Sequence, residues 1–239
     1  MKLLIELVFI AIIIACVWGG YKKGLVMTVG SILIIVVSLF AGDLLSDTFS
    51  SMATPMLRPF VSGYMEGADG AIELALTEVS GTASEILSEE DIIGGDADKA
   101  VEIARLSYLN MGIYAATSEQ MAQEAYEQYE LSGRTLSYSI IEVMCAKLTY
   151  YVCFILFFAV VLILLTVLGN ITNLSFKIPN MDKLNMIGGA VLGLAVAFAF
   201  CCVLAWILKF TGKLLPEEQL GSLSKYFVKM NFLSKYLSI

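Results

Sequence analysis

The stretch that decides the fold is VWGGYKKGLVM, residues 17–27, which places two glycines and two lysines between two long apolar runs. A lysine at the centre of a bilayer costs about 2.5–3.5 kcal/mol on insertion scales, whereas a lysine near the surface can reach lipid phosphates. Cytoplasmic loops of membrane proteins also carry an excess of lysine and arginine. The stretch therefore predicts the tight turn of a transmembrane hairpin, with Lys22 and Lys23 at the cytoplasmic surface.

The composition favours a membrane protein over a soluble one. Of the 239 residues, 58% are hydrophobic and 15% are charged, whereas an ordinary soluble domain has about 45–50% apolar and about 25% charged residues. Buried helices of a large soluble protein would need polar faces, and residues 154–165 have none. A cleavable signal peptide is the rival interpretation of residues 1–20, but no A-x-A cleavage site appears there.

Four segments reach or approach the length that a membrane span requires. Crossing about 30 Å of hydrocarbon takes roughly 20 apolar helical residues. The candidates are residues 3–18, 25–42, 148–168 and 186–208, with the third helix beginning near Ser139. All four prolines lie outside these segments, as expected of uninterrupted helices. We predict an all-α integral membrane protein with four transmembrane helices, arranged as two hairpins over residues 1–42 and 139–208.

An acidic block, residues 43–138, separates the two hairpins. It holds 17 of the 22 Asp and Glu residues and 4 of the 15 Lys and Arg residues. Asp96 and Ser118 are suited to cap helices, and Gly112 and Gly133 to end them. No D-x-D-x-D-G spacing indicates a calcium loop, so we expect the carboxylates to face solvent. The block predicts a small helical insertion outside the bilayer, on the extracytoplasmic side.

The tail, residues 209–239, predicts an amphipathic helix, because Leu223, Phe227 and Met230 recur near helical spacing. Two positions are open for it. It can lie on the bilayer surface with Tyr226 and Tyr236 as interface anchors, or it can pack on the acidic insertion by opposite charge.

The orientation follows from the short loops. Lys177 and Lys183 lie between the third and fourth spans and are expected on the same cytoplasmic side as Lys22 and Lys23. That arrangement leaves both termini and the acidic insertion outside. The lysines of the tail favour the reverse orientation.

Small residues predict where helices approach closely. Gly189 and Gly193 stand in GxxxG register, and Ala197 follows one turn later. Ser31 and Ser38 recur near helical spacing in the second span and are the predicted matching seam. Packing within one chain and dimerisation both explain such a seam.

Two ionisable groups beside the spans have individual predictions. Glu6, in the first turn of the first span, gains from the helix dipole and can reach the interface. Lys147 either extends to the bilayer surface or meets Glu6 or Asp43 from a neighbouring helix.

The chain carries none of the patterns that identify an enzyme. It has no histidine, and H-E-x-x-H, G-x-S-x-G, the P-loop and the dinucleotide fingerprint are all missing from the sequence. We therefore expect no catalytic, cofactor-binding or metal-ligating residues and no nucleic-acid partner. The expected partners are the lipid bilayer and either a second copy of the chain or another membrane protein.

The order of features resembles the colicin V production protein family, the CvpA-like bacterial membrane proteins. The resemblance rests on Glu6, on the turn GGYKKGLV with Gly20, Lys23 and Gly24, on MDKLNMIGGAVLGLAVA, and on the tail SLSKYFVKMNFLSKYL. It extends over residues 1–60 and 140–239. The acidic insertion is longer than the family usually has, and the arginine that often follows the second family glycine is missing after Gly193.

The resemblance implies a multipass bacterial inner-membrane protein associated with toxin production or export and with envelope integrity. It implies no defined reaction. Two hypotheses follow. The first is a non-enzymatic scaffold that binds a partner. The second is a small transporter or channel subunit whose path is lined by Thr28, Ser31, Ser38 and Thr149; the first is favoured because no span carries a central charge or a break.

Overall fold

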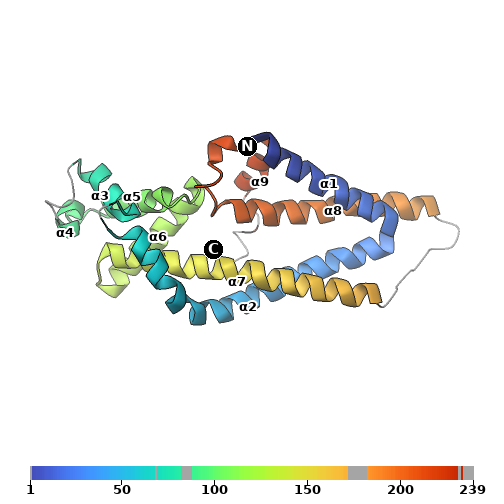
Figure 1. Cartoon of the computed structure of the whole chain (residues 1–239), viewed down its shortest axis with the longest axis horizontal. Coiled ribbons are helices and arrows are strands. Elements are labelled where there is room, and N and C mark those ends of the chain that lie inside the picture. Colours follow the sequence, from blue (N-terminus) through green and yellow to red (C-terminus); the bar gives the residue numbers. More distant parts are fainter. Residues whose placement is uncertain (1, 68, 82–87, 172–181, 231–232, 234–239) are drawn as a thin grey trace. The chain divides into compact units, whose positions relative to one another are not determined.

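The computed structural model describes residues 2–67, 69–81, 88–171, 182–230 and 233, and all its regular elements within these ranges are helices (Figure 1). This confirms the predicted all-α class. Lys177 and Tyr236, which entered the sequence predictions, lie outside the described residues. The elements are α1 (Lys2–Lys23), α2 (Leu25–Met65), α3 (Ala71–Ser80), α4 (Glu89–Ile93), α5 (Ala97–Asn110), α6 (Ala115–Ser132), α7 (Leu136–Ile171), α8 (Asp182–Leu208), the 3-10 turn η1 (Glu217–Gln219) and α9 (Ser222–Met230).

The chain divides into two compact units, which we call the membrane unit and the acidic unit. The membrane unit comprises Met1–Thr48, Tyr151–Leu208 and Glu218–Ile239, and the acidic unit comprises Phe49–Tyr150 and Lys209–Glu217. Helices α2 and α7 each contribute one part to each unit. These limits differ from the predicted segments 1–42, 43–138, 139–208 and 209–239.

Four of the described helices, α1, α2, α7 and α8, are long and apolar enough to cross a membrane, as the sequence predicts. Helix α2 is much longer than its predicted span, because its 41 residues correspond to about 60 Å at a rise of about 1.5 Å per residue. It continues through Pro55 and Pro59. Both prolines lie outside the predicted span 25–42, as expected, but inside the helix that continues beyond it, since a proline removes one backbone hydrogen bond and often bends a helix without stopping it.

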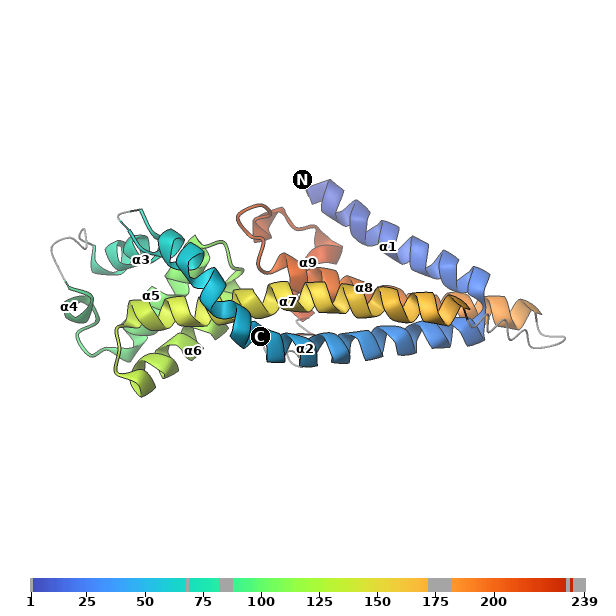
Figure 2. The same cartoon turned by 60° about the horizontal axis from the view of Figure 1, so that its bottom comes forward.

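In the membrane unit, α1 and α8 lie side by side, and α9 contacts both (Figures 1 and 2). Helix α7 joins α8 through the Tyr151 hydroxyl, which donates to the Ile207 carbonyl at 3.1 Å. The rings of Phe154 and Trp206 meet edge to face, with centroids 4.9 Å apart. Their outward faces expose large apolar side chains, as expected of helices surrounded by lipid tails.

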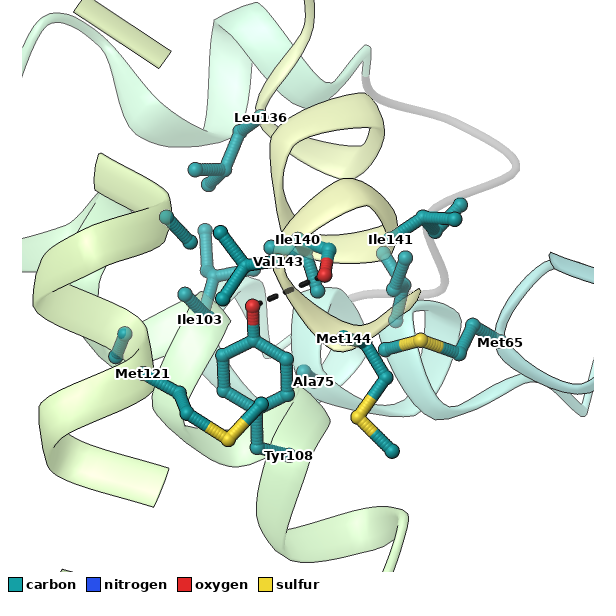
Figure 3. Packing of buried hydrophobic residues seen from close by; sticks show 14 of the residues in the cluster. Met65, Ala75, Ile103, Tyr108, Met121, Leu136, Ile140, Ile141, Val143 and Met144 are labelled. Carbon is teal, nitrogen blue, oxygen red and sulfur yellow. Dashed lines mark hydrogen bonds between the residues drawn. The ribbon is translucent and has the colours of Figure 1, made fainter. Parts of the chain in front are cut away.

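The acidic unit is built around a core of buried apolar side chains from the end of α2, from α3, α4, α5 and α6, and from the first turns of α7 (Figure 3). Tyr108 is fully buried in it, and its hydroxyl donates to the Ile140 carbonyl at 3.0 Å. Burial raises the pKa of Tyr108 well above its usual value of 10.0. This unit is therefore packed like a small soluble helical domain.

The predicted helix ends in the acidic unit are partly correct. The carboxylate of Asp96 accepts from the Asp98 N–H at 3.0 Å and caps α5, and Gly133 ends α6 in the left-handed region at φ 63°. Helix α6 begins at Ala115, however, so Ser118 lies inside its first turn and donates to the Ile113 carbonyl at 3.2 Å. A buried serine can cap a carbonyl of the preceding loop instead of a helix N–H.

Two of the ion pairs described in the acidic unit join different segments of it. Lys147 binds Glu124 at 2.8 Å, and Arg58 binds Glu142 at 3.1 Å. The sequence did not predict Glu124 as a partner of Lys147, because Glu124 is 23 residues away and comes close only when α6 packs beside the first turns of α7.

Candidate functional site

Helices α1 and α8 touch backbone to backbone through the predicted glycines of α8. A Cβ built on Gly193 would lie 2.6 Å from the Cys16 carbonyl oxygen, and one built on Gly189 would lie 2.7 Å from the Gly24 carbonyl carbon. Real Cβ atoms essentially never approach so closely. Ala197, one turn later, is also buried. Only residues without a side chain therefore fit at Gly189 and Gly193.

The matching surface lies at the C-terminal end of α1 and in the turn that follows it, and it includes Gly20 and Gly24. A Cβ on Gly20 would lie 3.0 Å from the Gly193 Cα, so glycine is required on this side of the contact as well. Gly20 and Gly24 are themselves in GxxxG register, within the segment GYKKG. That spacing was the signal that would have identified the partner surface from the sequence.

Ser31 and Ser38 do not form the surface that receives the α8 glycines. The Ser38 hydroxyl is buried and donates to the Ile34 carbonyl of its own helix at 2.7 Å. Ser31 donates to the Met27 carbonyl at 3.1 Å and accepts from the Lys23 ammonium at 3.4 Å. The close helix contact that the sequence assigned to α2 is made by α1, because glycines allow a nearer approach than serines.

The turn between α1 and α2 is fixed by Asn185 of α8. The Leu25 N–H at the start of α2 donates to the Asn185 side-chain oxygen at 2.8 Å. Gly24 has φ 79°, and a Cβ there would lie 2.5 Å from the Asn185 amide nitrogen. An asparagine from a distant helix thus caps α2, and nothing in the sequence around residues 17–27 pointed to it.

The three predicted surface lysines remain at the ends of their helices. Lys22 and Lys23 form the last turn of α1, and Lys183 is exposed in the first turn of α8. The ammonium of Lys22 lies 5.2 Å from the centre of the Trp18 ring. Cations in the last turn of α1 complement the helix dipole.

Glu6 of α1 caps α9, more than two hundred residues away in the sequence. Its carboxylate accepts from the N–H groups of Leu223 and Ser224 at 3.1 and 3.0 Å and from the Ser224 hydroxyl at 3.0 Å. Gly221 leaves room for the carboxylate, since a Cβ there would overlap it. A negative charge at the N-terminus of α9 is favoured by the helix dipole and by its unpaired N–H groups.

The apolar face of α9 completes this attachment. The Phe227 ring lies 5.7 Å from the ring of Phe9 in α1 and 5.7 Å from that of Phe198 in α8. The tail helix therefore packs on the spans themselves. The sequence analysis, which placed the helix on the bilayer surface or on the acidic insertion, did not predict these contacts.

A cavity of about 590 Å³ lies among the four spans of the membrane unit. It is mainly apolar, and its polar lining groups include Lys23, Ser31 and Thr166. The full lining is Ala15, Cys16, Gly19, Gly20, Lys23, Val26, Met27, Thr28, Gly30, Ser31, Ile34, Ile35, Leu162, Thr166, Gly169, Val196 and Phe200. Of the four hydroxyls predicted to line a path, Thr28 and Ser31 are in this lining and Ser38 and Thr149 are not.

Packing and hydrogen bonding join the described helices of the membrane unit. Within the described ranges, no three His, Cys, Asp or Glu side chains gather as a metal site would require. Hydroxyls in the spans, such as those of Thr28 and Ser38, donate to carbonyls one turn earlier in their own helices. The arrangement is suited to hold helices at fixed distances.

A family model described as Colicin V production protein matches residues 106–229, which is more than half of the chain. The match includes the end of α5, all of α6, α7 and α8, and α9 as far as Lys229. Its extent differs from the expected residues 1–60 and 140–239, because it begins inside the acidic block and leaves out the first hairpin. Searches of curated proteins and of solved structures gave no match.

Proposed function

Because the chain belongs to the colicin V production protein family, we propose that it is a non-enzymatic membrane scaffold for the production or secretion of a colicin V type toxin and for envelope maintenance. The chain is a membrane protein with four helices suited to span a bilayer. In this proposal it resides in the bacterial inner membrane, with the acidic unit on the extracytoplasmic side.

The family match is the observation that carries the toxin-related role. The scaffold role is supported by the way in which the matched helices are held. Gly193 fixes α8 on α1 by backbone contact, and Glu6 fixes α9 on α1 by three hydrogen bonds. A frame with such close contacts presents its outer faces at constant spacing, as binding of a second copy or another membrane protein requires.

A second candidate function is a small transporter or channel subunit, and the cavity among the four spans favours it. The cavity places Thr28 and Ser31 on one surface with Lys23. Ser38 and Thr149 lie elsewhere, so the polar path that this hypothesis needs is shorter than predicted. The scaffold proposal therefore remains the better supported of the two.

Toxin secretion in a producing bacterium tests the proposal. Removal of the chain should lower the amount of secreted colicin V type toxin, and the wild-type chain should restore it. Gly193→Leu should not restore secretion, whereas Val191→Leu, which also introduces a leucine in α8 but at an exposed position, should. Undiminished secretion without the chain would overturn the toxin-related role.

Reconstituted vesicles separate the two candidate functions. A scaffold should leave ion and small-solute flux at the level of empty vesicles. Flux that depends on the chain and falls in a Ser31→Val variant would assign the transporter or channel role instead.

A further inference from the structure

We propose that the cavity among α1, α2, α7 and α8 binds one acyl chain of an anionic phospholipid, with the lipid phosphate held at the ammonium of Lys23. This inference does not depend on the scaffold role. It rests on the shape of the cavity, on the glycines that keep it open and on the charge at its edge.

The cavity has the size and lining of a site for an apolar ligand. Its volume of about 590 Å³ falls within the roughly 300–1,000 Å³ that is usual for ligand pockets. On α1 the lining runs from Ala15 to Lys23, which is about 12 Å along the helix at a rise of about 1.5 Å per residue. Apolar side chains such as Ile34, Leu162 and Phe200 cover the interior. A segment of acyl chain fits such a surface.

Glycines on two helices keep this space open. A Cβ on Gly19 of α1 or on Gly30 of α2 would have no atom within 4 Å. Gly19 and its neighbour Gly20 thus have different environments, because Gly20 is pressed against α8 whereas Gly19 faces the cavity. The residues that line an unfilled apolar space lose dispersion contacts. In a bilayer, lipid acyl chains are the most abundant apolar groups that could occupy it.

The charge at the edge of the cavity selects an anion. Lys23 belongs to the last turn of α1, and its ammonium lies 3.4 Å from the Ser31 hydroxyl. The lining contains this ammonium and, among the described residues, no carboxylate. The ion pairs found in the described ranges use Arg58, Arg105 and Lys147, so Lys23 is not among the cations that they neutralise.

The position of Lys23 identifies the anion as a phospholipid headgroup. It ends a membrane-spanning helix, at the level where lipid phosphates lie, and the Thr166 hydroxyl of the lining can donate to a phosphate oxygen. A soluble anion has no acyl chain that could occupy the apolar interior of the cavity. A zwitterionic lipid would gain less from the ammonium, since its own cation competes for the phosphate.

Lipid retention by the purified full chain tests the proposal. The chain is transferred to mixed micelles that contain equal amounts of phosphatidylglycerol and phosphatidylcholine, and the bound lipid is counted by native mass spectrometry. We expect one phosphatidylglycerol per chain. Equal retention of both lipids, or retention of added oleate in place of phosphatidylglycerol, would overturn the proposal.

Two variants with matched controls locate the site. Gly30→Leu fills the cavity and should weaken retention at least about tenfold, because the lost burial of a few methylenes suffices for this. Gly63→Leu, at a helical glycine of α2 that also has open space but lies outside the cavity, should retain lipid as the wild type does. Wild-type retention by Gly30→Leu contradicts the assignment.

Lys23→Gln should reduce the preference for phosphatidylglycerol about fivefold, the usual effect of one basic residue near anionic lipid. Lys22→Gln, whose ammonium lies over Trp18 and not in the cavity lining, should leave the preference unchanged. This pair alters no packing and decides the question even where Gly30→Leu fails to fold. An unchanged preference in Lys23→Gln would exclude the headgroup contact.

Discussion

The helices inside the membrane unit and those inside the acidic unit pack in different ways. In the acidic unit, large side chains such as Tyr108 and Met121 fill the space between helices. In the membrane unit, α1 and α8 meet where Gly20 and Gly193 have no side chain at all. Burial of apolar surface drives association in water but not in lipid, where close backbone contact supplies the attraction. One chain therefore follows two packing rules, and the surrounding medium decides which applies.

The largest effect is expected from emptying the core of the acidic unit. Tyr108→Ala should destabilise this unit by about 3–5 kcal/mol, the usual cost of removing a buried aromatic ring. Hydrogen exchange of α5 measures the loss, and the tryptophans, both in the membrane unit, should report little change. Tyr108→Phe keeps the ring and gives the contribution of the hydrogen bond to Ile140. A small effect of Tyr108→Ala would show that the unit is not packed as a soluble domain.

Adding a side chain where α1 meets α8 should destabilise the membrane unit and leave the acidic unit unchanged. Gly193→Leu is expected to cost about 1–3 kcal/mol, or more, because the backbones must separate to admit it. Tryptophan fluorescence during unfolding in detergent measures this, while hydrogen exchange of α5 should stay as in the wild type. Val191→Leu, on the exposed side of α8, is the control. If both substitutions behave alike, close contact between α1 and α8 is not what stabilises the membrane unit.

Loss of the Glu6 carboxylate should have a smaller and local effect. Glu6→Ala removes the cap of α9 and should cost about 0.5–2 kcal/mol, as for other helix caps. Glu6→Gln retains an oxygen acceptor but loses the charge, so it should lie between Ala and the wild type. Faster hydrogen exchange at Leu223 and Ser224 is the expected sign. Unaltered exchange there in Glu6→Ala would mean that the aromatic contacts of Phe227 alone hold the helix.

The last prediction concerns pH and Lys209 of the acidic unit. Burial lowers the pKa of Lys209 from 10.5 to about 8. Between these two pH values the unfolded chain binds more protons than the folded one, so the stability of the unit should rise as pH increases from about 8 to about 10.5. Urea unfolding at several pH values measures the slope, and Lys209→Met should reduce it. A slope that Lys209→Met leaves unchanged would assign the dependence to other groups.

The sequence predicted the features that depend on neighbours along the chain. Length and apolarity identified the four spans, Asp96 and Gly133 marked helix ends, and Gly193 stood in a recognisable spacing. Local patterns are sufficient for these because a helix and its caps are made within a few residues.

The contacts between distant segments were not predicted. Glu6 was assigned to the dipole of its own helix and instead caps α9, and Lys147 meets a carboxylate of α6. No sequence pattern predicted that Asn185 contacts the start of α2. To predict each of these contacts, one must know how the helices are arranged in three dimensions. Periodicity within one helix does not give this information.

The cap that Glu6 places on α9 has a consequence for biogenesis. Translation produces Glu6 long before Ser224, so α1 enters the bilayer while its carboxylate still lacks the N–H groups that will receive it. Water and headgroups must solvate that charge until α9 has been translated. The nascent hairpin is thus an unfinished structure, and its first helix is completed by a segment made much later.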